Sequence, residues 1–183
     1  KERILKEGDI IGLDIGMWWP SQENQKSKIK NQKYQKGLCT DMAVTVGIGK
    51  ISEEAKRLID ITKESLDIGI AHVRDGITVG DIGFAIESFL KAHHVGIVRD
   101  LAGHGVGYEL HEEPLIPNYG KQGCGAKLKE GMVIAIEPMA TLGDWRVVLQ
   151  DDGWTFKTID NSLAAHFEHT MAVTKDGVDV LTK

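Results

Sequence analysis

An internal repeat is the feature that most constrains how this chain folds. Residues 5–14 (LKEGDIIGLD) match residues 128–137 (LKEGMVIAIE) at a constant offset of 128 − 5 = 123 positions. Each copy reads as a polar turn, a short apolar strand and then a carboxylate, which is Asp14 in the first copy and Glu137 in the second. The chain is therefore expected to contain two related halves.

A second pair of similar segments follows the first. Residues 40–45 (TDMAVT) resemble residues 168–174 (EHTMAVT), and they carry the carboxylates Asp41 and Glu168. The two carboxylates of each half are separated by comparable distances in sequence, 41 − 14 = 27 and 168 − 137 = 31 residues. We therefore expect two half-domains related by an approximate two-fold axis, each delivering two carboxylates from adjacent strands to a shared centre.

Between and around the copies, the hydrophobic pattern predicts helices and short strands. One helix is expected from an N-cap at Ser52 to about Ile70, and another from Thr78, with Asp81 as its capping partner, to about Leu90. Segments rich in Val, Ile and Thr predict strands at 9–17, 41–47, 132–138, 146–149 and 167–174. These elements predict an α+β architecture with a mostly antiparallel sheet.

Composition limits the classes of protein that fit. A chain of 183 residues with 42% hydrophobic residues suits one domain spanning 1–183, and no apolar run is long enough to cross a bilayer, so we expect a cytoplasmic monomer. A formal charge of −5 argues against nucleic acid as the main substrate. Two isolated cysteines, Cys39 and Cys124, predict neither a disulfide framework nor a thiolate zinc site.

Residues 21–37 depart from this composition, because they are rich in Lys and Gln and almost free of apolar side chains. Such a segment cannot be a core strand, so we interpret it as an exposed loop inserted between the strands of Asp14 and Asp41. A solvated loop is the simpler interpretation. Its lysines also leave open a weak contact with the ribosome, RNA or an acidic partner.

Four carboxylates and one imidazole form the candidate metal site. Mn²⁺, Fe²⁺, Co²⁺ and Zn²⁺ accept mixed oxygen and imidazole ligands, and carboxylates can bridge two such ions. An isolated Asp or Glu at a strand end is more often a cap or turn residue. However, Asp14, Glu137 and Glu168 lie in or beside apolar stretches, where a charge needs a partner. His104 lies between glycines in 103–107 (GHGVG), which permits either an ordinary tight turn or close approach of a ligand.

Several longer motifs carry a resemblance to a known family. Residues 102–114 (AGHGVGYELHEEP), 136–139 (IEPM), 152–158 (DGWTFKT) and 162–170 (SLAAHFEHT) resemble, in the same order, the motifs of type I methionine aminopeptidases. The likeness covers nearly the whole chain. It implies the pita-bread fold of that family, whose two pseudo-symmetric halves agree with the internal repeat.

The resemblance also implies a role for each matching residue. Two divalent ions would be bound by Asp14, Asp41, His104, Glu137 and Glu168, with Asp14 terminal and Asp41 and Glu168 bridging. Glu137 would also be the general base for the water that attacks the peptide bond after an N-terminal methionine, and His111 would contact the substrate and help stabilise the tetrahedral intermediate. Met139 and Trp154 would line the methionine pocket, although both also fit as plain core residues.

The chain departs from the family pattern in two places. The family has a region before the first ligand strand that contributes helices, pocket residues and a histidine in an H-G-[IV] motif, and nothing in this sequence matches it. We therefore interpret the chain as N-terminally truncated, with a pocket open on one side. The family also has a short hairpin between its first two aspartates, where this chain has 26 intervening residues (41 − 14 − 1 = 26).

Two other interpretations remain open beside removal of initiator methionine from nascent chains and peptides. An Xaa-Pro aminopeptidase or prolidase shares the fold and the five ligands that the resemblance implies. A peptide-binding relative with impaired catalysis would keep the fold and lose the reaction.

Overall fold

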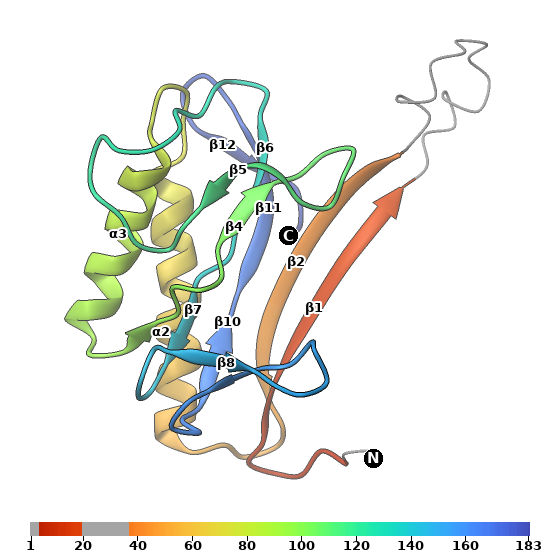
Figure 1. The fold of residues 1–183 in the computed structure, drawn as a ribbon, viewed down its shortest axis with the longest axis vertical. Coiled ribbons are helices and arrows are strands. Elements are labelled where there is room, and N and C mark those ends of the chain that lie inside the picture. The colour runs from red at the N-terminus through yellow and green to blue at the C-terminus, as the bar shows by residue number, and fades with distance from the viewer. Residues whose placement is uncertain (1–3, 20–36) are drawn as a thin grey trace.

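The computed structural model describes residues 4–19 and 37–183, and it places two long helices against a curved antiparallel sheet (Figure 1). The helices are α2 (Glu53–Ala71) and α3 (Val79–Ala92). The strands are β1 (Ile10–Trp19), β2 (Leu38–Gly47), β3 (Gly96–Ile97), β4 (Gly103–Gly105), β5 (Glu112–Ile116), β6 (Val133–Ile136), β7 (Met139–Thr141), β8 (Val147–Leu149), β9 (Phe156–Thr158), β10 (Ala164–His166), β11 (Glu168–Val173) and β12 (Val178–Val180).

The main sheet has the strand order β1-β2-β11-β6-β4-β5, with β12 pairing β11, and every pairing in it is antiparallel. The predicted α+β architecture is therefore confirmed. The order of its first four strands also reflects the repeat, since β1 and β2 carry the first copy while β6 and β11 carry the second. The two copies meet where β2 pairs β11, with Ala43 opposite Glu168.

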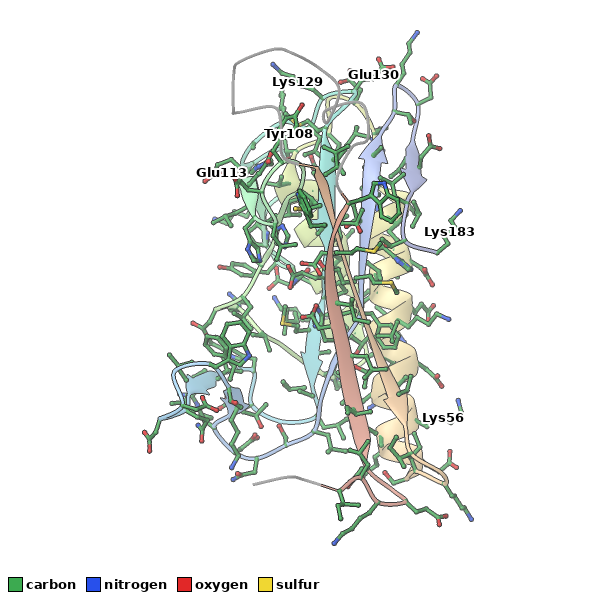
Figure 2. The ribbon with its side chains drawn as sticks, turned by 90° about the vertical axis from the view of Figure 1, so that its right-hand side faces the viewer. Lys56, Tyr108, Glu113, Lys129, Glu130 and Lys183 are labelled. Atoms are coloured by element: carbon green, nitrogen blue, oxygen red, sulfur yellow. The ribbon has the colours of Figure 1, made fainter. Side chains whose placement is uncertain are left out.

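Alternation along the strands gives the sheet two different faces. Successive side chains of a strand point to opposite sides, so Ile134 and Ile136 of β6 face one way while Ala135 faces the other. Ile134 and Ile136 are fully buried in the core beneath α2 and α3. Figure 2 shows α2 on this side of the sheet and the β8–β9 hairpin on the opposite side. The face away from the helices is the one that is free to carry a site.

Both helices begin where the sequence predicts. Ser52 caps α2 by accepting a hydrogen bond from the Ala55 amide at 3.1 Å. At α3, Thr78 and Asp81 form the reciprocal capping box, which satisfies amides that a helix start would otherwise leave unbonded. Leu58, Leu66 and the apolar residues of α3 then enter the main core.

The predicted strands are present, but the sequence interpretation missed several short ones. β3, β4, β5, β7, β9, β10 and β12 contain only two to five residues each. The Lys- and Gln-rich loop expected at 21–37 lies outside the described residues except for its last position, Gly37. Within the described ranges, no helix is long and apolar enough to cross a membrane.

Candidate metal centre

The five predicted ligands converge on the sheet face opposite the helices. Asp14, Asp41 and His104 lie within β1, β2 and β4, Glu137 directly follows β6, and Glu168 begins β11. The register explains the shared face, because Asp14 lies opposite Ala43, which in turn lies opposite Glu168. Five strands that are neighbours in the sheet thus present one ligand each.

Their ligand atoms fall into overlapping groups. Asp14, Asp41 and Glu168 offer atoms within 4.8 Å of one another, and so do His104, Glu137 and Glu168. Glu168 belongs to both groups, as a bridging carboxylate must. A third group of the same compactness joins Asp41 and His104 with His111. This arrangement has the connectivity of two adjacent cation sites.

Burial makes the carboxylates costly to ionise in the absence of a cation. Glu168 is 2% exposed, and burial, reinforced by Glu137, Asp41 and Asp14, raises its pKa to about 9. The pKa of Asp41 is also raised, first by burial and then by the charge of Asp14, while His104 acts in the opposite direction. Two positive ions would reverse this repulsion.

Two oxygen atoms of the cluster also lack hydrogen-bond partners. Asp41 Oδ1 and Glu168 Oε1 are buried and accept no hydrogen bond from any residue that the structure describes. Buried polar atoms are normally satisfied, so unpartnered oxygens on two residues of the ligand groups fit a positive partner. The residues present therefore fit divalent cations with oxygen and imidazole ligands.

Asp41 is fixed in the centre by a threonine of the neighbouring strand. Its backbone N–H donates to Thr170 Oγ1 at 2.8 Å, and Thr170 Oγ1 donates to the Asp41 carbonyl at 2.7 Å. One buried hydroxyl thus holds both backbone polar groups of the ligand residue. The bond pair locks β2 to β11 close to the centre, where the two halves of the molecule meet.

His104 is oriented by its own strand. Its Nδ1 lies 2.9 Å from the Gly105 carbonyl oxygen, which can only accept, so Nδ1 donates this bond and Nε2 is the nitrogen that faces the carboxylates. Nε2 lies 3.5 Å from Glu137 Oε1 and 4.0 Å from Asp41 Oδ2. Both separations exceed a hydrogen bond, and they leave Nε2 available as a ligand.

The glycines on either side of His104 do not form a tight turn. Neither Gly103 nor Gly105 has a positive φ, and both lie in β4. A Cβ on Gly103 would lie 2.4 Å from the Ala135 carbonyl oxygen, and one on Gly105 would lie 2.3 Å from the Glu113 carbonyl oxygen. These glycines permit close approach of the adjacent strands, which brings His104 alongside β6.

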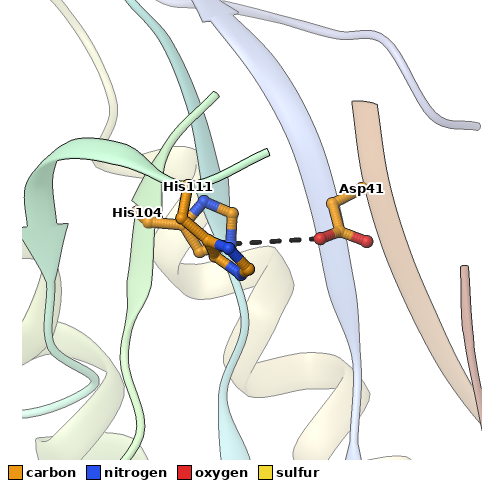
Figure 3. Close-up of side chains that lie close together, drawn as sticks. All are labelled: Asp41, His104 and His111. Carbon is orange, nitrogen blue, oxygen red and sulfur yellow. Dashed lines mark ion pairs between the residues drawn. The ribbon is translucent and has the colours of Figure 1, made fainter. Parts of the chain in front are cut away.

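His111 lies beside His104 at the edge of the centre. The centroids of the two imidazole rings are 4.4 Å apart in an edge-to-face arrangement. Figure 3 shows both rings together, across from the Asp41 carboxylate that His104 faces. His111 is exposed, unlike His104. Together they border a cavity of about 420 Å³ whose other lining residues are Ala102, Glu112, Glu113 and Leu115.

The two predicted pocket residues are placed differently. Met139 lines an apolar cavity of about 170 Å³ next to the carboxylates, together with Gly12, Thr45, Val98, Leu101, Val147, Phe156, Thr158, Ala164, Ala165 and His166. Trp154 does not line it. This side chain is 85% exposed in the turn between β8 and β9, so the structure does not bring it to the centre and its role stays a prediction.

Sequence reasoning missed one residue of this site. His166 lines the same cavity, and its Nε2 lies 3.5 Å from Glu137 Oε2. The available signal was its place two positions before Glu168, since residues i and i+2 of an extended segment share a face.

The model of metallopeptidase family M24 matches residues 31–175. The chain belongs to metallopeptidase family M24. A methionine aminopeptidase of Clostridium acetobutylicum is 44% identical to this M24 chain over 182 residues. The matched residues cover 100% of the chain and 66% of the relative. A methionine aminopeptidase of Mycoplasma capricolum is 40% identical, with coverage of 100% and 67%.

Solved structures agree with this assignment. The crystal structure of methionine aminopeptidase from Thermotoga maritima has a TM-score of 0.87 and 42% identity, covering 99% of the chain and 66% of that protein. The prolidase from Pyrococcus furiosus has a TM-score of 0.71 at 24% identity, with coverage of 100% and 44%, and it shows the fold alone. The expected pita-bread fold is confirmed. The chain spans about two thirds of the length of the methionine aminopeptidases it matches.

Proposed function

We propose that this chain catalyses the metal-dependent removal of the N-terminal initiator methionine from peptides and nascent proteins. The observation that carries the proposal is the pair of compact ligand groups that share Glu168. The relatives at about 40% identity are named methionine aminopeptidases, which supplies the substrate class. All five ligands are present and converge, which argues against a relative that has lost catalysis.

Two divalent ions of Mn, Fe, Co or Zn are the proposed cofactors. Asp14 would hold one ion and His104 and Glu137 the other, with Asp41 and Glu168 shared by both. Ions of this kind lower the pKa of a water molecule and polarise a peptide carbonyl. The unpartnered oxygens of Asp41 and Glu168 support this set of ligands.

The protein's own residues would then manage the proton and the substrate. Glu137 has a side chain only 12% exposed and shares a ligand group with His104 and Glu168, which suits a carboxylate that accepts the proton of the attacking water. His111 stands exposed beside the cavity of about 420 Å³ and would donate a hydrogen bond to the oxygen of the scissile amide.

The apolar cavity of about 170 Å³ is the proposed site for the methionine side chain. Its walls include Met139 and Phe156, and an unbranched thioether packs well against such irregular apolar surfaces. Gly12 and Thr45, on its floor, lie two residues from Asp14 and Ala43 along the same strand face. A side chain bound there would therefore be adjacent to the carboxylate cluster.

Hydrolysis of a peptide panel tests the proposal. With Mn²⁺ or Co²⁺ added, the chain should release methionine from Met-Ala-Ser and Met-Gly peptides and leave Xaa-Pro peptides intact. Glu137→Gln should abolish release, whereas Glu64→Gln on the exposed face of α2 should have no effect. Preferential cleavage of Xaa-Pro peptides would favour a prolidase instead, and activity that survives Glu137→Gln would contradict the assigned base.

A further inference from the structure

His166 is an ionisable residue that lies at the metal centre but is not one of the five proposed ligands. It ends β10, and its side chain is 21% exposed. Nε2 lies 3.5 Å from Glu137 Oε2, while Nδ1 lies 4.0 Å from Asp14 Oδ2. Glu137 thus lies between two imidazoles, with Oε1 toward His104 and Oε2 toward His166, each at 3.5 Å.

The backbone of His166 is held as firmly as that of a ligand. Its N–H donates to Thr45 Oγ1 at 2.9 Å, and Thr45 Oγ1 donates to the His166 carbonyl at 2.9 Å. Thr170 makes the same pair of bonds to Asp41. The two threonine clamps lie on either side of the Ala43–Glu168 pair, so the contact between the two halves fixes His166 and Asp41 in equivalent ways.

The ring itself is poorly satisfied where it stands. His166 Nε2 is buried and has no hydrogen-bond partner among the described residues, because its neighbours in the cavity wall are mainly apolar. A buried polar nitrogen without a partner is unfavourable, so an apolar side chain would serve a purely structural wall better. Of the centre's carboxylate oxygens, Glu137 Oε2 lies within a few tenths of an ångström of bonding range.

We propose that His166 is a positioning residue whose Nε2–H donates a hydrogen bond to Glu137 Oε2 and so orients the Glu137 carboxylate in the metal centre. The bond would hold Oε1 toward His104 and the shared centre. This inference rests on the proposed metal-dependent function. It concerns how Glu137 is aimed, and it assigns His166 no direct contact with an ion.

Three substitutions separate this role from a structural one. His166→Gln places an amide N–H close to the position of Nε2, whereas His166→Asn offers the same chemical group nearer to Nδ1, on the Asp14 side. His166→Leu fills the cavity wall without any donor. Only the bond to Glu137 distinguishes the Gln variant from the matched Asn variant.

The measurements are calorimetric Mn²⁺ titration, the visible absorption spectrum of the Co²⁺-loaded chain, and thermal melting of the chelator-treated proteins. We expect His166→Leu and His166→Asn to weaken binding of one Mn²⁺ by about 10- to 100-fold and to alter the Co²⁺ spectrum. His166→Gln should keep both close to those of the unsubstituted chain. No variant should have a metal-free melting temperature clearly below that of the unsubstituted chain, so that a loss of affinity is not a loss of fold.

Two results would overturn the inference, and they are distinguishable from failure of the proposed function. If the unsubstituted chain binds two ions and the Leu and Asn variants bind them equally tightly, the function stands and His166 has no positioning role. The same conclusion follows if His166→Gln loses as much affinity as His166→Asn. If the unsubstituted chain itself binds no Mn²⁺, the proposed function fails and the inference fails with it.

Discussion

The two copies of the repeat present carboxylates to one centre from very different surroundings. In the second copy, Ile136 is fully buried beneath the helices, and Glu168 is 2% exposed. In the first copy, the equivalent of Ile136 is Leu13 (13 + 123 = 136), which is 45% exposed, and the Asp14 side chain is 62% exposed. The same sequence pattern therefore yields a buried core strand in one half and a solvent-exposed strand in the other.

The helices account for this difference. α2 and α3 pack on β6 and β11, while β1 lies at the far edge of the sheet from them (Figure 1). On the face of β1 opposite the site, Leu13, Ile15, Met17 and Trp19 are each 45–68% exposed. Glu137 and Glu168 are thus positioned by core packing, whereas Asp14 depends on the pairing of β1 with β2. We therefore expect the loss of a ligand in the second half to weaken metal binding and activity more than the loss of Asp14.

The largest effect should follow from removing the shared ligand. Glu168→Gln keeps the size of the side chain but removes the charge common to both groups, so neither ion should bind and methionine release should fall below detection. Asp14→Asn alters only one group and should leave one ion bound. Calorimetric titration with Mn²⁺ measures both. Equal losses in the two variants would show that exposure does not rank the ligands.

The next largest effect should be the difference in stability between alanine substitutions at equivalent positions of the two copies. Ile136→Ala should lower the free energy of unfolding by about 2–5 kcal/mol, because it opens a cavity in a filled core. Leu13→Ala should cost about 1 kcal/mol or less, since nearly half of that side chain remains in water. Urea denaturation of both variants measures this. Similar costs would mean that β1 is covered in solution.

The buried carboxylate of the second half should also make metal-free stability depend on pH. The pKa of Glu168 is about 9 in the folded chain against an ordinary value of 4.5. Between these values the folded state keeps a proton that the unfolded state has released, so raising the pH favours unfolding. The melting temperature of the chelator-treated chain should fall from pH 5 toward pH 9. Glu168→Gln should flatten this dependence, and an unchanged slope would contradict the assignment.

The smallest effect should come from a larger side chain at Gly12, a residue of the first copy that lines the apolar cavity. A Cβ on Gly12 would meet nothing within 4 Å, so Gly12→Leu can extend into the cavity without displacing the backbone. We expect it to raise KM for methionine peptides about tenfold, with Mn²⁺ binding preserved. Gly12→Ala is the matched control and should change little. An unchanged KM in Gly12→Leu would place the methionine side chain elsewhere.

The parts of this account that were predictable from sequence are those with strong local signals. The repeat located four carboxylates, and the caps at Ser52 and Thr78 fixed both helix starts. The short strands were missed, because two to five residues are too few to show a period of two. β4 was additionally obscured by its glycines, which resemble a turn in sequence but permit close strand packing in the fold.

The placement of individual side chains was harder to predict, since it depends on tertiary contacts. Trp154 belongs to a family motif, yet it is exposed in a hairpin turn. His166 belongs to the same kind of motif and points into the centre, where Thr45 of another strand fixes it. The local signal that separates the two cases is the place of His166 two positions before Glu168 in an extended segment, which Trp154 lacks. The proposed single domain, the monomeric state, the cytoplasmic location and any contact made by 21–37 stay predictions.

The most direct test of the central claim is a crystal structure of the chain grown with Mn²⁺, in which anomalous scattering locates the ions. The two halves are expected to hold two peaks between them, with Glu168 contacting both, Asp14 contacting only one and His104 only the other. A single peak, or two peaks that do not share Glu168, would contradict a centre built jointly by both copies of the repeat.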